Sequence, residues 1–211
     1  TFEAFTRLPD DVWSWYLYRR AVCRRAEPNA AHLALAELER SGGAGGGDRF
    51  LLVTQNVDGL HLRAGSSLER TYQILGNIDF MRCSRECTPE QLRIPEEVDP
   101  GWEKGRALGE AERELLVCPR CGERARPHVL WFDELYDEDR FRFDSSMRAA
   151  VEADLLVVVG TAGVTNLPLQ MGAMVARRGA PLIAVNLDPS PFTQLAEASE
   201  SGHVLEGKAT Q

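Results

Sequence analysis

Three apolar runs of this 211-residue chain, at 50–53, 155–159 and 182–185, each end in polar or glycine residues. Short runs of this kind are typical of strands that are buried on both faces of a parallel sheet. In such a sheet, ligands bind at the carboxyl ends of the strands. The three polar ends therefore predict a crevice that holds a nucleotide.

Segments with a helical pattern alternate with these strands. We predict helices at 10–22, 28–40, 147–153 and 167–178, and a short strand at 70–78 that Gly76 interrupts. The first helix has aspartates at its start and arginines toward its end, which the helix dipole favours. Alternating strands and helices predict an α/β fold with a doubly wound parallel sheet.

A glycine-rich segment at 41–48 joins the second predicted helix to the first predicted strand. Clustered glycines at such a place are typical of a flexible connection. The segment lacks a Gly-x-Gly-x-x-Gly spacing between a strand and a helix. We therefore do not expect a phosphate-binding loop there.

Five cysteines are present, and four of them form two close pairs, Cys83 with Cys87 and Cys118 with Cys121. Two pairs at this spacing can place four thiolates around one zinc ion. Four thiolates leave no open coordination position, so the predicted zinc is structural rather than catalytic. The alternative is two unrelated pairs of buried or free cysteines.

The cysteine pairs lie in the segment 79–126, which is polar and contains prolines and glycines. We interpret it as a small zinc-ribbon module, inserted into a larger domain that residues 1–78 and 127–211 form. Metal ligation rather than disulfide bonding indicates a reducing compartment, and we therefore expect a cytoplasmic location.

Charge and hydropathy argue against two classes of partner. The formal net charge is −8 and the pI is about 5.1, which disfavours a nucleic-acid groove. No apolar run approaches the roughly 18 residues that a membrane span needs. The chain begins at Thr1, and we expect the natural amino terminus to precede it. The sequence indicates no oligomeric state.

The segment after the first apolar run combines Gln55, Asn56 and Asp58. These side chains supply amide donors, carbonyl acceptors and a carboxylate at the predicted mouth of the sheet. The set suits a sugar and a carboxamide better than a phosphate. The alternative is a polar turn in which the asparagine and the aspartate cap their own backbone.

Taken in order, these segments resemble the sirtuins, a family of NAD-dependent protein deacylases. The most specific match is the segment 54–65, Thr-Gln-Asn-Val-Asp-Gly-Leu-His-Leu-Arg-Ala-Gly. The other matches are residues 13–16, 28–32, the four paired cysteines, 127–132, 160–162 and 186–188. Each motif alone is weak, but together they cover nearly the whole chain in the family's order. The resemblance implies a Rossmann-like domain with a small zinc module.

By this resemblance, the chain binds NAD with four of its segments. Gln55, Asn56 and Asp58, with Val57 between them, hold the nicotinamide ribose and its carboxamide, and Asn56 also belongs to the catalytic site. The remaining contacts with the cofactor are implied for Gly160, Thr161, Ala162, Asn186, Leu187, Asp188 and Ala209. A glycine directly after a buried strand lets the backbone approach a ligand closely.

The resemblance also implies that the substrate is an acylated lysine of a protein or peptide. The backbone at 129–132 would pair with the peptide as an added strand. The tunnel for the acyl-lysine chain would be lined by Val129, Leu130, Trp131 and Phe132. The alternative is a plain core strand, because tryptophan and aliphatic residues are typical of both.

Tyr16 and Arg19 lie at i and i+3 and so share one helix face. They match the Tyr-x-x-Arg pair of sirtuins that favour succinyl- or malonyl-lysine. A guanidinium is well shaped to bind the carboxylate of such an acyl group. The alternative is a surface arginine beside a half-buried tyrosine.

Leu75 departs from the family pattern, because the catalytic histidine of sirtuins stands in a His-Gly pair and this chain has Leu75-Gly76. In the sirtuin mechanism, the acyl oxygen attacks the ribose carbon as nicotinamide leaves. The histidine then acts as the general base for a ribose hydroxyl, and such a base typically contributes about 10²–10⁴-fold. Leucine accepts no proton, so we expect deacylation to be severely impaired.

A second departure is the start of the chain, since the first strand and the Gly-Ala-Gly-rich loop of a sirtuin precede the point that matches Thr1. We expect both segments upstream, because a sheet without a central strand exposes two edges.

Four functions stay open for this sequence. They are an impaired NAD-dependent deacylase, ADP-ribosyl transfer or NAD hydrolysis, non-catalytic binding of NAD or acyl-lysine, and a zinc-ribbon nucleic-acid binder, which the charge disfavours.

Overall fold

The computed structural model describes residues 1–42 and 49–210, and these form two compact units. We call them the amino-terminal unit and the carboxyl-terminal unit, and we describe each by itself. The amino-terminal unit comprises Thr1–Pro28 and His32–Arg142, and the carboxyl-terminal unit comprises Asn29–Ala31 and the chain from Phe143 onward.

The structure does not test two of the sequence predictions. Most of the glycine-rich connection predicted at 41–48 lies outside the described residues. The insertion of a separate module at 79–126 stays a prediction. Among the described residues, no helix combines the length and the apolar character that a membrane crossing requires.

The amino-terminal unit contains helices and two small sheets. Its helices are α1 (Phe2–Arg7), α2 (Pro9–Arg25), α3 (Ala30–Arg40), α4 (Leu60–Arg63), α5 (Glu110–Leu115) and α6 (Glu138–Phe141). Its strands are β1 (Leu52–Thr54), β2 (Thr71–Gln73), β3 (Gly76–Cys83), β4 (Leu92–Arg93) and β5 (Ala125–Val129). The first two residues of α3 belong to the other unit.

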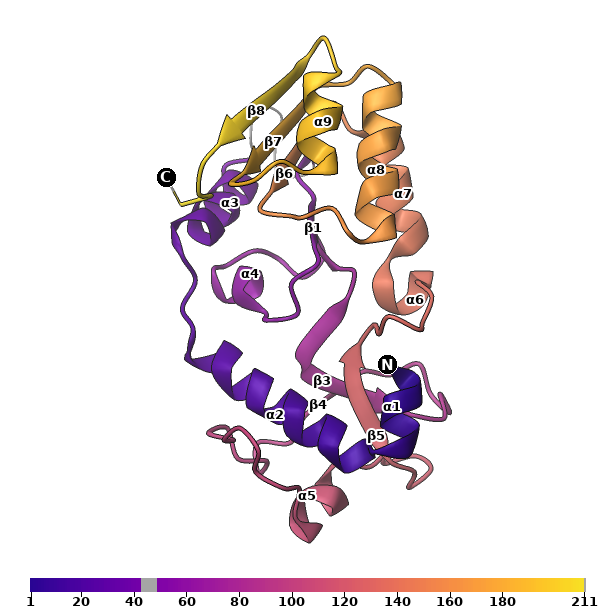
Figure 1. Ribbon diagram of the computed structural model, residues 1–211. Coiled ribbons are helices and arrows are strands. Elements are labelled where there is room, and N and C mark those ends of the chain that lie inside the picture. Colours follow the sequence, from indigo (N-terminus) through magenta and orange to yellow (C-terminus); the bar gives the residue numbers. More distant parts are fainter. Residues whose placement is uncertain (43–48, 211) are drawn as a thin grey trace. The chain divides into compact units, whose positions relative to one another are not determined.

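The strands of this unit pair in two ways. β1 and β2 are parallel, with Leu52 opposite Thr71, whereas β3 is antiparallel to both β4 and β5. Figure 1 shows β3 and β5 side by side, with α2 alongside them. The single strand predicted at 70–78 is wrong in its extent, because one strand ends at Gln73 and the next begins at Gly76.

The core of the amino-terminal unit forms where α2 packs on β3 and β5. Trp13 and Leu17 are four residues apart on one helix face, and each is at most 1 % exposed. They cluster with Met81 of β3 and Val129 of β5. The indole N–H of Trp13 donates to the Ala125 carbonyl at 2.9 Å. The helix predicted at 10–22 is thus confirmed as α2.

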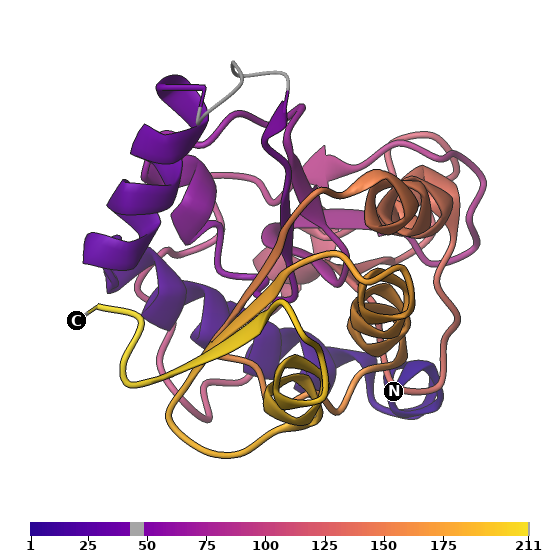
Figure 2. The same ribbon diagram turned by 90° about the horizontal axis from the view of Figure 1, so that it is seen from above.

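The carboxyl-terminal unit is a parallel sheet with helices. Its elements are α7 (Phe143–Glu152), β6 (Leu156–Val159), α8 (Asn166–Arg177), β7 (Leu182–Asn186), α9 (Pro191–Glu197) and β8 (Gly202–Glu206). The strand order is β6-β7-β8, and both pairings are parallel. Figure 2 shows the helices from orange to yellow beside these strands. Parallel strands that alternate with helices confirm the predicted α/β class.

Helix α9 covers one face of this sheet. Its Phe192 and Ala196 cluster with Leu182 and Ala184 of β7. The prediction that 155–159 is buried on both faces is wrong, since Leu155, Val157 and Val159 are 37–49 % exposed. β6 is an edge strand with a single hydrogen-bonded neighbour among the described residues. The sequence analysis also missed α9 and β8, which are short and lack a long apolar run.

Candidate functional site

Four thiols from two segments of the amino-terminal unit lie together. Cys83 ends β3 and Cys87 follows it, while Cys118 and Cys121 stand in a turn closed by the bridge between Val117 and Arg124. The four sulfur atoms all lie within 4.8 Å of one another. The distance from Cys83 to Cys121 is 3.6 Å and from Cys87 to Cys118 it is 3.5 Å.

This arrangement fits a zinc ion. Zinc–sulfur bonds of about 2.3 Å in a tetrahedron place the sulfur atoms roughly 3.8 Å apart. The backbone N–H groups of Cys121 and Arg120 hydrogen-bond to the Cys118 sulfur and lower the pKa of that thiol to about 7. Thiolates are the form that binds metal. The four cysteines are thus placed to bind a structural zinc, as the sequence analysis predicted.

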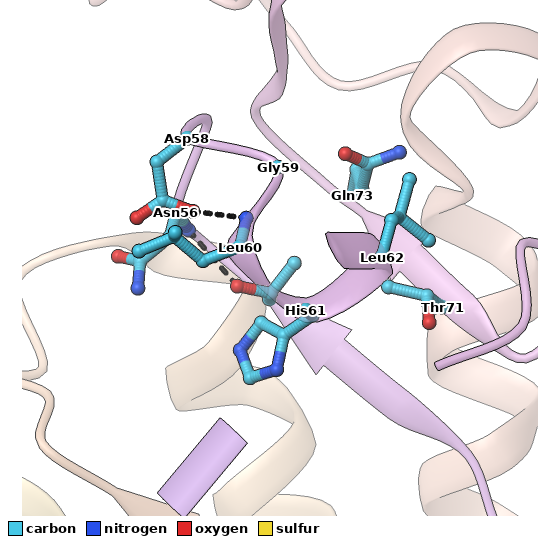
Figure 3. A pocket seen from close by; sticks show the side chains of 9 residues that line it. Asn56, Asp58, Gly59, Leu60, His61, Leu62, Thr71 and Gln73 are labelled. Carbon is cyan, nitrogen blue, oxygen red and sulfur yellow. Dashed lines mark hydrogen bonds between the residues drawn. The ribbon is translucent and has the colours of Figure 1, made fainter. Parts of the chain in front are cut away.

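The loop after β1 connects this strand to α4. The Asn56 N–H donates to the Thr54 hydroxyl at 3.1 Å, and the Leu60 N–H donates to the Asp58 carboxylate at 2.9 Å (Figure 3). Gly59 stands between loop and helix with φ +71°, a left-handed conformation that suits glycine. The aspartate therefore caps its own backbone, yet its second oxygen and the exposed Asn56 amide keep hydrogen-bonding capacity.

A shallow, narrow pocket lies at this loop. It is lined by Thr54, Asn56, Asp58, Gly59, Leu60, His61, Leu62, Thr71 and Gln73. Figure 3 shows the Asn56 and Asp58 side chains extending from the same loop. Gln55 and Val57 belong to the loop but do not line the pocket.

Two amides near the loop escaped the sequence analysis. The side-chain N–H of Asn77 donates to the Gln73 amide oxygen at 2.7 Å, and the Asn77 oxygen accepts from the Asp79 N–H at 2.9 Å. A Cβ atom at Gly59 would lie 3.5 Å from the Asn77 side chain. Asn77, which is 5 % exposed, thus lies beside the loop, and the neighbouring Ile78 N–H donates to the Val57 carbonyl at 2.9 Å and so joins β3 to the loop. Its place directly after Gly76 was its only sequence signal.

Leu75 lies between β2 and β3, and its carbonyl accepts the Leu130 N–H at 3.0 Å. Its side chain is half-buried. The neighbouring Gly76 has φ +88°, and a Cβ atom there would lie 2.1 Å from the His128 carbonyl oxygen. Packing therefore requires a glycine at this position. That Leu75 takes the place of the family's histidine stays a prediction.

Two histidines of this unit, His61 and His128, are poorly suited to act as a general base. His128 is 2 % exposed and stacks on Phe141, and burial together with Arg82 lowers its pKa to about 3. The His61 ring lies 4.6 Å from the His32 ring, and burial also lowers the pKa of His61. A base with a strongly lowered pKa has little affinity for a proton at neutral pH.

The predicted cofactor residues of the carboxyl-terminal unit lie at or after the ends of β6, β7 and β8. The Asn186 amide donates to the carbonyls of Thr161 at 3.0 Å and Asp188 at 3.1 Å, and so joins the ends of the two strands. Gly160 has φ +61°, and a Cβ atom there would meet no atom within 4 Å. The backbone after β6 is therefore open to a ligand. Ala162, Leu187, Asp188 and Ala209 are exposed.

The predicted substrate residues lie on α2, at the end of β5 and just after it. The indole N–H of Trp131 donates to the Tyr16 hydroxyl at 2.7 Å, and the Trp131 ring is only 5 % exposed. Trp131 and Val129 belong to the core, whereas Phe132 is fully exposed and Leu130 lines a separate pocket. The guanidinium of Arg19 lies 5.2 Å over the Trp15 ring. Contact of these residues with a substrate stays a prediction.

Comparison with known proteins assigns a family to this arrangement. The model of the Sir2 family matches residues 1–166. An NAD-dependent protein deacylase of Thermus thermophilus is 41% identical over 209 residues, which are 99% of this chain and 74% of the relative. A relative of the same name from Leptospira interrogans is 35% identical and covers 97% of this chain and 76% of its own length.

Solved structures agree with these relatives. A Sir2 homologue in complex with NAD superimposes with a TM-score of 0.78 at 33% identity, covering 99% of this chain and 70% of the other. A mutant Sir2 homologue in complex with 2′-O-acetyl ADP ribose gives a TM-score of 0.77 at 33% identity, covering 99% and 72%. These matches confirm the predicted Rossmann-like fold class. The chain therefore belongs to the Sir2 family, whose members are the sirtuins.

Proposed function

We propose that this chain is an NAD-dependent protein-lysine deacylase in which Leu75 greatly slows the deacylation step. Curated relatives named NAD-dependent protein deacylase support the activity, and the homologue that was solved with 2′-O-acetyl ADP ribose supports acyl transfer to a ribose. The observation that carries the proposal is the polar loop 55–58 at the carboxyl end of a parallel strand.

NAD, when bound, supplies a ribose carbon that becomes electrophilic as nicotinamide departs. In the amino-terminal unit, the Asn56 amide can both donate and accept hydrogen bonds, so it suits a carboxamide. The Asp58 carboxylate accepts one backbone N–H and keeps lone pairs that suit ribose hydroxyls. We assign Gln55 and Val57 of the same loop to this ribose and carboxamide contact.

In the carboxyl-terminal unit, the open backbone of Gly160, Thr161 and Ala162 would lie beneath the adenosine side of NAD. The Asn186 amide holds this loop in place through the Thr161 carbonyl. Asn186, Leu187, Asp188 and Ala209 would contact the adenine and its ribose.

The acyl-lysine peptide would add a strand beside residues 129–132. Tyr16 and Arg19 would then bind the terminal carboxylate of a succinyl or malonyl group. Arg19 is exposed and forms no ion pair with any residue that the structure describes, so its charge is available to a substrate.

The proposed location is a reducing compartment, the cytoplasm. Free thiols that are arranged to bind a metal support it.

Leu75 is the reason to expect slow deacylation. Its side chain accepts no proton, and burial lowers the pKa of both His61 and His128. The same leucine favours a second candidate function, in which the protein binds NAD or releases nicotinamide without deacylating a peptide. The two candidates differ in their products and are separated by one assay.

The assay combines the protein, NAD and acetyl- or succinyl-lysine peptides, and follows nicotinamide and deacylated peptide separately. Leu75→His should raise the rate of deacylation by about 10²–10⁴-fold, because it restores a general base. Leu75→Asn is the matched control, since it adds polarity without a base. Rapid deacylation by the unchanged protein that Leu75→His does not alter would contradict the proposal. Nicotinamide release alone would support the second candidate.

A further inference from the structure

The hydrogen bond between Trp131 and Tyr16 has a defined direction. Indole nitrogen is a donor only, so at 2.7 Å the Tyr16 oxygen must act as the acceptor. The hydroxyl proton of Tyr16 then points elsewhere, and within the described part of the chain no group accepts it. Tyr16 is therefore held as a hydrogen-bond donor toward whatever lies in front of it.

We propose that Trp131 is a positioning residue, which fixes Tyr16 as a donor and so makes the Tyr16–Arg19 pair selective for acyl groups that end in a carboxylate. The proposal rests on the proposed function and names its substrate class. A carboxylate only accepts hydrogen bonds, and it therefore matches a fixed hydroxyl donor beside a guanidinium. A neutral carboxamide offers one acceptor oxygen and an NH₂ group that neither partner can use.

The environment of Trp131 keeps its ring in one place. The Arg126 guanidinium lies 3.6 Å over the ring, and the Phe5 ring packs against it with centroids 5.5 Å apart. The Trp131 backbone N–H donates to the Glu134 carboxylate at 2.9 Å, and the same carboxylate accepts from Arg126 at 2.7 Å. The bonded pair of Arg126 and Glu134 thus holds both the ring and the backbone of Trp131, as a positioning residue requires.

Tyr16 and Arg19 are both available for this role. Burial raises the pKa of Tyr16, so the phenol stays protonated and able to donate at neutral pH. Arg19 lies one turn further along α2, stacks on the exposed Trp15 ring, and has no acidic partner among the residues described. A charged donor and a neutral donor at i and i+3 can meet two oxygens of one carboxylate.

The test measures binding of three peptides to the full chain without NAD. They carry succinyl-lysine, its neutral isostere ending in a carboxamide, or acetyl-lysine. Trp131→Phe keeps an aromatic ring but removes the donor, and it should lower the preference for succinyl-lysine over the isostere about tenfold. Affinity for the acetyl-lysine peptide should change less than about twofold, because that group has no carboxylate.

Two variants separate this role from a loss of packing. Trp13→Phe is the matched control, because its indole is also buried and bonded, but to the Ala125 carbonyl rather than to Tyr16. It should keep the selectivity. Tyr16→Phe leaves the Trp131 ring in place and should lose the selectivity to the same extent. The double variant should then be no worse than Tyr16→Phe alone, since both changes act through one hydroxyl.

Equal losses for succinyl- and acetyl-lysine peptides in Trp131→Phe would overturn the proposal, and so would additive effects in the double variant. If the unchanged protein prefers succinyl-lysine and Trp131→Phe keeps that preference, only the role of Trp131 fails. If the unchanged protein binds none of the three peptides, both the proposed function and the role of Trp131 fail.

Discussion

The two units bury different kinds of side chain. The amino-terminal unit buries Arg20, Arg82, Arg126 and His128, each at most 4 % exposed, and it also carries the four clustered cysteines. Among the described residues of the carboxyl-terminal unit, no Asp, Glu, Lys or Arg is buried, and its core is aliphatic and aromatic. One unit therefore combines an apolar core with buried charges and a metal site, whereas the other relies on apolar burial alone.

The difference has a physical cause. A buried arginine is tolerated only with an anionic partner, and Arg82 and Arg126 share the Glu134 carboxylate at 3.2 and 2.7 Å. Arg20 donates to Asp79 at 3.0 Å. These pairs and the thiolates respond to pH and metal, whereas packing of Phe192 against β7 does not. Changes in conditions and in sequence should thus affect the two units separately.

Removal of zinc should produce the largest effect, confined to the amino-terminal unit. Chelation, or Cys118→Ala, should abolish protection of backbone amides near β3 and β5, because structural zinc contributes about 10–16 kcal/mol in small zinc-finger peptides. Hydrogen exchange should show that the amides of β6, β7 and β8 keep their protection. Protein purified without zinc, yet with full protection at β3, would contradict this division.

Phe192→Ala tests the opposite unit. Phe192 is 2 % exposed and packs on Leu182 and Ala184, so its truncation should lower the free energy of unfolding by about 3–5 kcal/mol. Denaturant unfolding measures the loss, and zinc content should stay at one ion per chain. Loss of zinc in this variant would show that the two units do not respond separately.

Acid should destabilise the amino-terminal unit through His128. The pKa of His128 is about 3 in the folded protein and about 6.5 in the unfolded chain. Between these two pH values, the unfolded chain binds the proton and the folded protein does not. The stabilisation is complete above the unfolded pKa and is lost as the pH falls toward 3. Glu134 acts in the same direction, because hydrogen bonds from Arg126 and the Trp131 N–H outweigh burial and lower its pKa.

The contribution of His128 is about 2 kcal/mol between pH 7.5 and 5. His128→Leu removes the titrating group, so its free energy of unfolding should depend less steeply on pH over this interval. Unfolding by denaturant at both pH values measures the difference between variant and parent. Identical slopes would show that His128 already titrates normally in the folded protein.

Much of the fold could be predicted from local pattern. The helix of Trp13 and Leu17 follows from apolar residues at four-residue spacing, and β6 and β7 follow from aliphatic runs. The extent of β2 and β3 could not be predicted, because it depends on the close approach of Gly76 to the His128 carbonyl on another strand. The edge position of β6, and hence the exposure of Val157, depends on strand order.

The sequence by itself determined the family and the four cysteines that are placed to bind zinc, because these features reside in residue type and spacing along the chain. The tertiary structure decided which side chains meet. It placed the Trp131 indole on the Tyr16 hydroxyl, the Glu134 carboxylate between two buried arginines, and Asn77 against the loop at Gly59. Such contacts join residues far apart in the chain, and only the packing of elements brings them within hydrogen-bonding distance.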